Sequence, residues 1–180
     1  MKISYGQNVY GKEEITAVIK QIKKTTQMGK SVNLFEKKIG KHFDKKYSLM
    51  VNSGSSALTL AMNVLNFKKD DEILTPCLNF GTAVSSIILS GSKPKFIDID
   101  IETLQINIDD LEKKISKKSK GLLVPNLIGN IPNWIKLRKI AKKYNLKIIE
   151  DSADTIGYTI NKKNTGKFSD ITTNSFYASH

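Results

Sequence analysis

The chain has 180 residues, of which 39% are hydrophobic, so it is long and apolar enough to form one domain or a large part of one. Its net charge of +12 comes almost wholly from scattered lysines, with Arg138 the lone arginine, so we interpret it as compositional bias rather than a nucleic-acid-binding surface. No apolar run has the length that a bilayer requires and the first residues do not resemble a signal peptide, so we expect a cytoplasmic protein without a membrane partner.

Helical and strand-like patterns alternate along the chain, with turn residues such as Lys69-Asp70-Asp71 between them. Apolar spacing predicts helices at residues 13–22, 32–43, 57–65, 81–89, 108–115 and 135–144. Short apolar runs predict strands at residues 47–51, 72–75, 95–99, 121–125 and 146–150, and a strand with a polar end is one interpretation of residues 174–180.

This alternation predicts an α/β fold of three layers, in which a mostly parallel sheet is covered by helices on both faces. Ligands of such sheets bind outside the carboxyl ends of the strands, where loops lead into helices. The candidate site is therefore expected at that edge. The polar residues that follow expected strands are Ser53 to Ser56, Asn79 with Phe80, residues 126–130, and Asp151.

Cysteine and histidine are too few for a disulfide or a metal site. Cys77 is the only cysteine, and His42 and His180 are the only histidines. Their spacing matches no metal-ligand pattern, so we predict no metal site among them. An iron–sulfur cluster needs several cysteine thiolates, which Cys77 alone does not supply, and any such cysteines would lie beyond His180.

The motif Ser53-Gly54-Ser55-Ser56 lies between an expected strand and an expected helix. Its amides and hydroxyls can surround a phosphate at the positive end of the helix dipole. A serine N-cap after a tight glycine turn explains the same residues, and for the motif alone that is the commoner case.

Two acidic residues, Glu150 and Asp151, close an apolar strand. At least one carboxylate is thereby placed at the ligand edge, where burial without a partner is costly. A protonated pyridine nitrogen would relieve that cost, as in pyridoxal-phosphate enzymes. Capping of the next segment is an alternative of equal weight. Phe80, judged singly, belongs to a core more often than to a cofactor platform.

Four segments occur in an order and spacing that decide between these alternatives. They are Ser53 to Leu58, Gly91 to Asp100, Glu150 to Asp154 and Ser175 to His180. Their succession closely resembles the DegT/DnrJ/EryC1/StrS sugar aminotransferase family, whose members are fold-type I pyridoxal-phosphate enzymes. The resemblance implies an N-terminal arm at residues 1–30 and part of the cofactor-binding large domain at residues 31–180, with the remainder and the small domain absent. It also implies a homodimer.

Carried over by position, the resemblance implies a cofactor-binding role for six residues, one of which is Asp154. Gly54 and Ser55 would hold the phosphate of the cofactor, and Ser175 would add a hydroxyl. Phe80 would stack on the pyridine ring, and Asp151 would pair with the ring nitrogen.

Two positions depart from the aminotransferases of this family. Those enzymes read Ser-Phe-x-x-x-Lys, with the lysine forming a Schiff base with the cofactor, whereas the same spacing from Ser175 ends here in His180, whose imidazole cannot form one. Asp154 stands where they usually carry a glutamine that faces the ring hydroxyl. Both departures, and residues 126–130, are similar to the dehydratase branch, which removes the C3 hydroxyl from nucleotide-linked 4-keto-6-deoxyhexoses.

The resemblance thus implies a 3-dehydratase of deoxysugar and surface polysaccharide synthesis that uses the pyridoxamine form of the cofactor. His180 would act as the general base and Asp151 would keep the ring nitrogen protonated. A nucleotide sugar would be the substrate and glutamate a suitable amino donor. The alternatives are a sugar-nucleotide aminotransferase and a truncated, non-catalytic relative of this fold.

Overall fold

Five parallel strands form the central sheet of this protein, which we describe from a computed structural model over residues 9–177. The strand order is β2-β1-β3-β4-β7, so the chain adds β2 on one side of β1 and continues on the other side with β3. The strands are β1 (Glu72–Pro76), β2 (Lys93–Ile97), β3 (Ser119–Pro125), β4 (Lys147–Ser152) and β7 (Ile171–Asn174).

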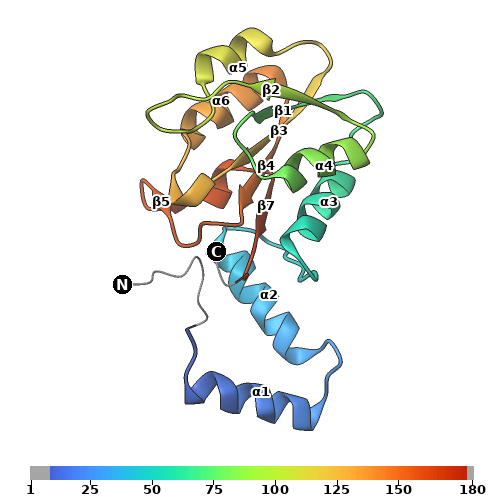
Figure 1. Cartoon of the computed structure of the whole chain (residues 1–180), viewed down its shortest axis with the longest axis vertical. Helices are drawn as coiled ribbons and strands as arrows, with labels where there is room; N and C mark the ends of the chain where they lie inside the picture. Colours follow the sequence, from blue (N-terminus) through green and yellow to red (C-terminus); the bar gives the residue numbers. More distant parts are fainter. Residues whose placement is uncertain (1–8, 178–180) are drawn as a thin grey trace.

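Within residues 9–177, six α-helices accompany the sheet, and two short strands form an antiparallel hairpin beside it. Figure 1 shows α5 and α6 together on one side of the sheet, with α3 and α4 on another. The helices are α1 (Lys12–Lys24), α2 (Lys30–His42), α3 (Gly54–Leu65), α4 (Gly81–Leu89), α5 (Ile108–Lys114) and α6 (Trp134–Tyr144), and the hairpin joins β5 (Thr159–Ile160) to β6 (Lys163–Asn164).

The core has two halves, one on each face of the sheet. Along β3, Leu122 and Val124 pack against α5 and α6, whereas Leu123 packs against α3 and α4. The same alternation separates Ile148 from Ile149 in β4. Successive side chains of a strand point to opposite faces, so a strand covered by helices on both sides is apolar at every position. The predicted α/β fold of three layers is confirmed.

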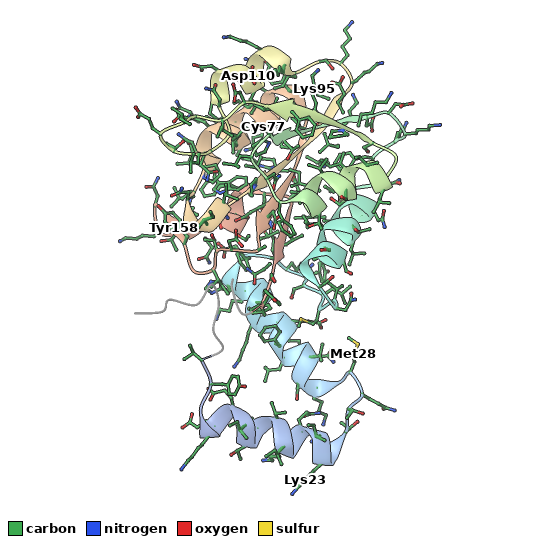
Figure 2. The ribbon with its side chains drawn as sticks, viewed as in Figure 1. Lys23, Met28, Cys77, Lys95, Asp110 and Tyr158 are labelled. Carbon is green, nitrogen blue, oxygen red and sulfur yellow. The ribbon has the colours of Figure 1, made fainter. Side chains whose placement is uncertain are left out.

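The helices α1 and α2 extend away from this layered domain (Figure 1). No residue of α1 is buried, and Gly40 is the only buried residue of α2. Figure 2 shows Lys23 and Met28 at this end of the molecule and Lys95 and Asp110 at the opposite end. The helices with several buried side chains, α3, α4 and α6, pack against the sheet instead.

One predicted element is wrong, and one is misplaced. Residues 47–51 form no strand, because their polar groups bond to α2 instead of to a neighbouring strand: the Met50 amide donates to Glu36 Oε1 at 2.8 Å, and the Ser48 hydroxyl donates to the Glu36 carbonyl. The last strand occupies Ile171–Asn174, and residues 175–177, which were read as part of it, follow its end. The helix predicted at residues 81–89 has its observed bounds, and the other predicted elements are present with shifted ends.

Within residues 9–177, no helix combines the length and the apolar character that crossing a bilayer requires.

Candidate functional site

A cavity of about 890 Å³ opens at the carboxyl ends of the strands. It lies where the chain order of the strands reverses, because the loop after β1 and the loop after β3 diverge there. Six of the seven residues that the sequence singled out line this cavity, and the seventh, His180, lies outside the described residues. The six are Gly54, Ser55, Phe80, Asp151, Asp154 and Ser175.

The N-terminus of α3 forms one wall of the cavity. Ser53 caps the helix, and its hydroxyl accepts a hydrogen bond from the Ser56 amide at 3.1 Å. The next two residues, Gly54 and Ser55, therefore present the first amides of the helix, which have no partner within it. A methyl group placed on Gly54 would lie 3.6 Å from Ser175 Cβ, so Ser175 lies directly beside the helix end. This wall can bind an anion.

Asp151, at the end of β4, forms the floor of the cavity and is 6% exposed. Its Oδ1 accepts hydrogen bonds from the Ala153 amide at 3.2 Å and from the Thr173 hydroxyl at 3.3 Å. The carboxylate is thus held in place by its own loop and by the neighbouring strand β7. A buried carboxylate in this position suits a cationic ligand group.

Phe80 stands at the rim of the cavity, with 69% of its surface exposed. The loop that carries it is fixed by Asn79, whose side chain donates to Thr75 Oγ1 at 2.9 Å and accepts from the Phe80 amide at 2.8 Å. The structure therefore does not place Phe80 in the core. An exposed ring on a fixed loop can stack on a flat ligand.

Asp154 lies opposite a short helical turn, η1 (Leu127–Gly129), that follows β3. Its Oδ2 accepts a hydrogen bond from the Ile128 amide at 3.4 Å. Ile128 has a φ of 53°, a left-handed conformation that is unfavourable for a β-branched residue and that is found mostly at functional sites. The side chain of Ile128 is 79% exposed at the cavity.

A polar network that the sequence did not predict lies next to the cavity and is centred on the face of the sheet opposite to Asp151; its members Asn126 and Thr172 also line the cavity. Its centre is Glu150, which is completely buried. Glu150 Oε1 accepts from Asn126 Nδ2 at 2.9 Å and from the Ser152 hydroxyl at 3.2 Å. Its Oε2 accepts from the hydroxyls of Ser169 at 3.0 Å and Thr172 at 2.9 Å. The signal in the sequence was a charged residue within an apolar strand.

Lys45 is joined to this network through a hydrogen bond to Ser169. Its Nζ donates to the carbonyls of Gly166 at 2.7 Å and Ser169 at 2.8 Å and to Ser169 Oγ at 3.1 Å. Burial lowers the pKa of Lys45 from 10.5 to about 8, although the negative charges of Glu150 and Asp170 oppose this shift. Lys45 was not singled out by the sequence, because nothing local distinguishes it from its many neighbouring lysines.

No group of three or more histidine, cysteine, aspartate or glutamate side chains among residues 9–177 is arranged to hold a metal ion. The fold and the cavity define an α/β domain with an anion-binding helix end and a buried carboxylate at the carboxyl edge of a parallel sheet. A family profile, the DegT/DnrJ/EryC1/StrS aminotransferase family, matches residues 9–180, and the chain belongs to this family.

Individual relatives agree with this assignment. The chain is 38% identical over 160 residues to the lipopolysaccharide biosynthesis protein RfbH of Salmonella typhimurium, covering 84% of this chain and 37% of the relative. It is 36% identical to the GDP-4-keto-6-deoxy-D-mannose 3-dehydratase of Escherichia coli O55:H7, covering 85% of this chain and 41% of that enzyme. It is 33% identical to the GDP-perosamine synthase of Vibrio cholerae, covering 83% and 41%.

A solved structure gives the same picture. The E. coli GDP-4-keto-6-deoxy-D-mannose-3-dehydratase with bound hydrated PLP superposes with a TM-score of 0.83 at 31% identity, covering 88% of this chain and 43% of that one. The chain thus spans about two fifths of the length of the relatives that it matches.

Proposed function

We propose that the protein carrying this chain removes the C3 hydroxyl from a nucleotide-linked 4-keto-6-deoxyhexose with the help of pyridoxamine phosphate. The observation that carries the proposal is His180, which occupies the position five residues after Ser175 where aminotransferases of the family carry lysine. A histidine cannot bond covalently to the cofactor, so a freely exchanging amine form is favoured. The similarity to 3-dehydratases supports the same reaction.

The cavity fits this cofactor at three points. The helix end at Gly54 and Ser55, with Ser175 beside it, suits a phosphate. The buried Asp151 suits a protonated ring nitrogen, and the exposed ring of Phe80 suits the flat face of a pyridine. When bound, the cofactor supplies an amine that condenses with a ketone and a ring that withdraws electrons.

Three residues of the protein would then have separate roles. Asp151 would hold the proton on the ring nitrogen, which keeps the ring electron-withdrawing. Asp154 would orient the ring through its hydroxyl. His180, whose pKa is ordinarily near neutrality, would take a proton from the cofactor's methylene carbon while the C3 hydroxyl of the sugar departs.

An aminotransferase remains the second candidate, because the 3-oxo-glucose-6-phosphate:glutamate aminotransferase of Bacillus subtilis is also a relative, at 32% identity. The two reactions differ in where nitrogen goes. A dehydratase that ends in hydrolysis releases the amine as ammonia, whereas an aminotransferase leaves it on the sugar.

The test uses glutamate labelled with heavy nitrogen, the purified protein, and a GDP-linked 4-keto-6-deoxymannose. We expect labelled ammonia and a sugar that has lost one oxygen atom, detected by mass spectrometry. Label in the sugar would favour the aminotransferase instead. Borohydride adds a second test, since covalent attachment of the cofactor to the protein would rule out the assignment of His180.

We further propose that the protein acts as a homodimer in the cytoplasm, with residues 1–30 as an arm and residues 31–180 as part of the cofactor-binding domain. No residue of α1 is buried, which supports the interpretation of this segment as an arm. The exposed apolar side chains of α1 support an interface in which another protein surface covers them. Analytical ultracentrifugation of the purified protein tests the dimer.

A further inference from the structure

The polar network around Glu150 has a place in the proposed function. We infer that Glu150 is a positioning residue. Its carboxylate, on the face of the sheet opposite to Asp151, fixes β3, β4 and β7 relative to one another. Asp151 is thereby held facing the ring nitrogen of the cofactor. This inference rests on the proposed function, because it concerns the same cavity.

The hydrogen bonds of Glu150 reach three strands at once. Asn126 follows β3, Ser152 ends β4, and Thr172 lies in β7; all three donate to its carboxylate. A fourth donor, Ser169, comes from the loop before β7. Each carboxylate oxygen therefore accepts two hydrogen bonds, so the acceptor capacity of this buried side chain is filled by the protein itself.

Asn126 extends the network into the core and toward the cavity. Its Oδ1 accepts from Trp134 Nε1 at 2.8 Å, and its Nδ2 also donates to the Ser152 hydroxyl at 2.6 Å. The backbone carbonyl of Asn126 accepts from the Thr155 hydroxyl at 2.9 Å, which ties it to the loop that carries Asp154. All the polar atoms of the Asn126 side chain are thus paired, so the network allows one arrangement of these groups.

The same three strands form the floor of the cavity on the face that carries Asp151. Asp151 follows Glu150 directly, and Thr173, which donates to Asp151, follows Thr172 directly. Glu150 and Asp151 share one stretch of backbone, as do Thr172 and Thr173, so a shift of either strand on the Glu150 face is passed on to the residue on the opposite face. The network around Glu150 and the carboxylate of Asp151 are therefore mechanically coupled.

A pair of substitutions separates positioning from mere stability. Asn126→Asp places a second carboxylate against Glu150 and repels it. Adding Glu150→Gln to that variant reverses the polarity of the contact: the new amide donates to the new carboxylate, Trp134 still donates to position 126, and the hydroxyls of Ser169 and Thr172 donate to the amide oxygen. Every group regains a partner, so the double variant restores the geometry with the negative charge moved.

The readout isolates the contact of Asp151 with the ring nitrogen. Affinity for pyridoxal phosphate is compared by equilibrium dialysis with affinity for its 1-deaza analogue, in which carbon replaces that nitrogen. The wild type is expected to prefer pyridoxal phosphate. The Asp151→Asn variant gives the ratio of the two affinities that remains when the charge pair is absent. Trp134, the only tryptophan, reports by its fluorescence that each variant is folded around the network.

We expect Asn126→Asp to reduce the preference for pyridoxal phosphate by about tenfold or more, the size expected when a close charge pair is lost. The double variant is expected to recover it. Ile87→Ala, in α4 and in the core cluster on the other face of the sheet, is the matched control, because it lowers stability without touching the network and is expected to keep the preference. If Asn126→Asp does not fold, Thr172→Val, which removes one donor, is expected to lower the preference several-fold.

Each outcome has a definite meaning. A folded Asn126→Asp or Thr172→Val variant with unchanged preference would overturn the positioning role, as would a folded double variant that recovers nothing. A wild type that binds neither compound would overturn the proposed function itself. A wild type that binds both equally would overturn the role of Asp151 and, with it, that of Glu150.

Discussion

Two neighbouring carboxylates, one on each face of the sheet, have different environments. Glu150 and Asp151 are consecutive in β4, and both are buried. Glu150 lies on the back, where four donors from the protein enclose it. Asp151 lies on the front and lines an open cavity. The back is built to hold the strand ends together, whereas the front is built to receive a ligand.

This difference shows how one strand end serves both stability and binding. A buried network whose polar groups all bond to one another stabilises one geometry, whereas a carboxylate that lines a cavity can also meet the charge of a ligand. The comparison predicts that substitutions on the back act mainly on folding and that substitutions on the front act mainly on binding.

The largest effect on stability is expected at Glu150. Glu150→Ala removes a fully buried side chain that accepts four hydrogen bonds, and we expect a loss of roughly 3–5 kcal/mol in the free energy of unfolding. Asp151→Asn keeps the shape of the front carboxylate and is expected to cost only about 1 kcal/mol while abolishing tight cofactor binding. Urea denaturation and equilibrium dialysis measure the two quantities. Equal losses of stability for the two variants would contradict the comparison.

The next effect depends on pH and concerns Lys45. Because the pKa of Lys45 is about 8 in the folded protein and 10.5 without burial, the unfolded state holds more protons between these values. The burial of the charge is therefore a full cost below pH 8, and this cost is relieved as the pH rises toward 10.5. We expect the stability of the wild type to rise relative to Lys45→Met across this range, measured by urea denaturation at several pH values. Parallel pH profiles would show that Lys45 keeps its ordinary pKa.

Much of the fold was predictable because it depends on local pattern. The helix of residues 81–89 was predicted with its observed bounds, and the strand at residues 121–125 lies within β3, since the apolar spacing and turn residues are contiguous in the sequence. The strand predicted at residues 47–51 failed because β-like composition does not reveal whether a partner strand is present. Those residues bond to Glu36 of α2.

The site was predictable in part for a different reason. The order of four motifs identified the family, and six of the residues carried over with them line one cavity. The roles of these residues and of His180 stay predictions. The network around Glu150 could not be predicted, because Lys45 and Ser169 are more than a hundred residues apart and neither belongs to a pattern. The left-handed backbone of Ile128 likewise has no signature in an isoleucine.

A smaller effect separates two neighbouring serines at the front. Ser53→Ala removes the cap of α3 and is expected to lower the free energy of unfolding by about 1 kcal/mol. Ser55→Ala changes an exposed hydroxyl, so it is expected to leave stability within about 0.5 kcal/mol and to weaken phosphate binding instead. Thermal unfolding and dialysis against pyridoxal phosphate measure both. If Ser53→Ala alone weakened binding, the roles of the two hydroxyls would be reversed.

The smallest effect is expected far from the sheet, on α1. Ile19 is 49% exposed there, and serine has a helix propensity close to that of isoleucine, so Ile19→Ser tests only whether something covers the apolar face. In a monomer, we expect a change of less than about 0.5 kcal/mol in the free energy of unfolding. In the homodimer proposed above, the same substitution would cost more, and the cost would grow with protein concentration. Urea denaturation at two concentrations therefore decides whether the α1 face is solvent-exposed or part of an interface.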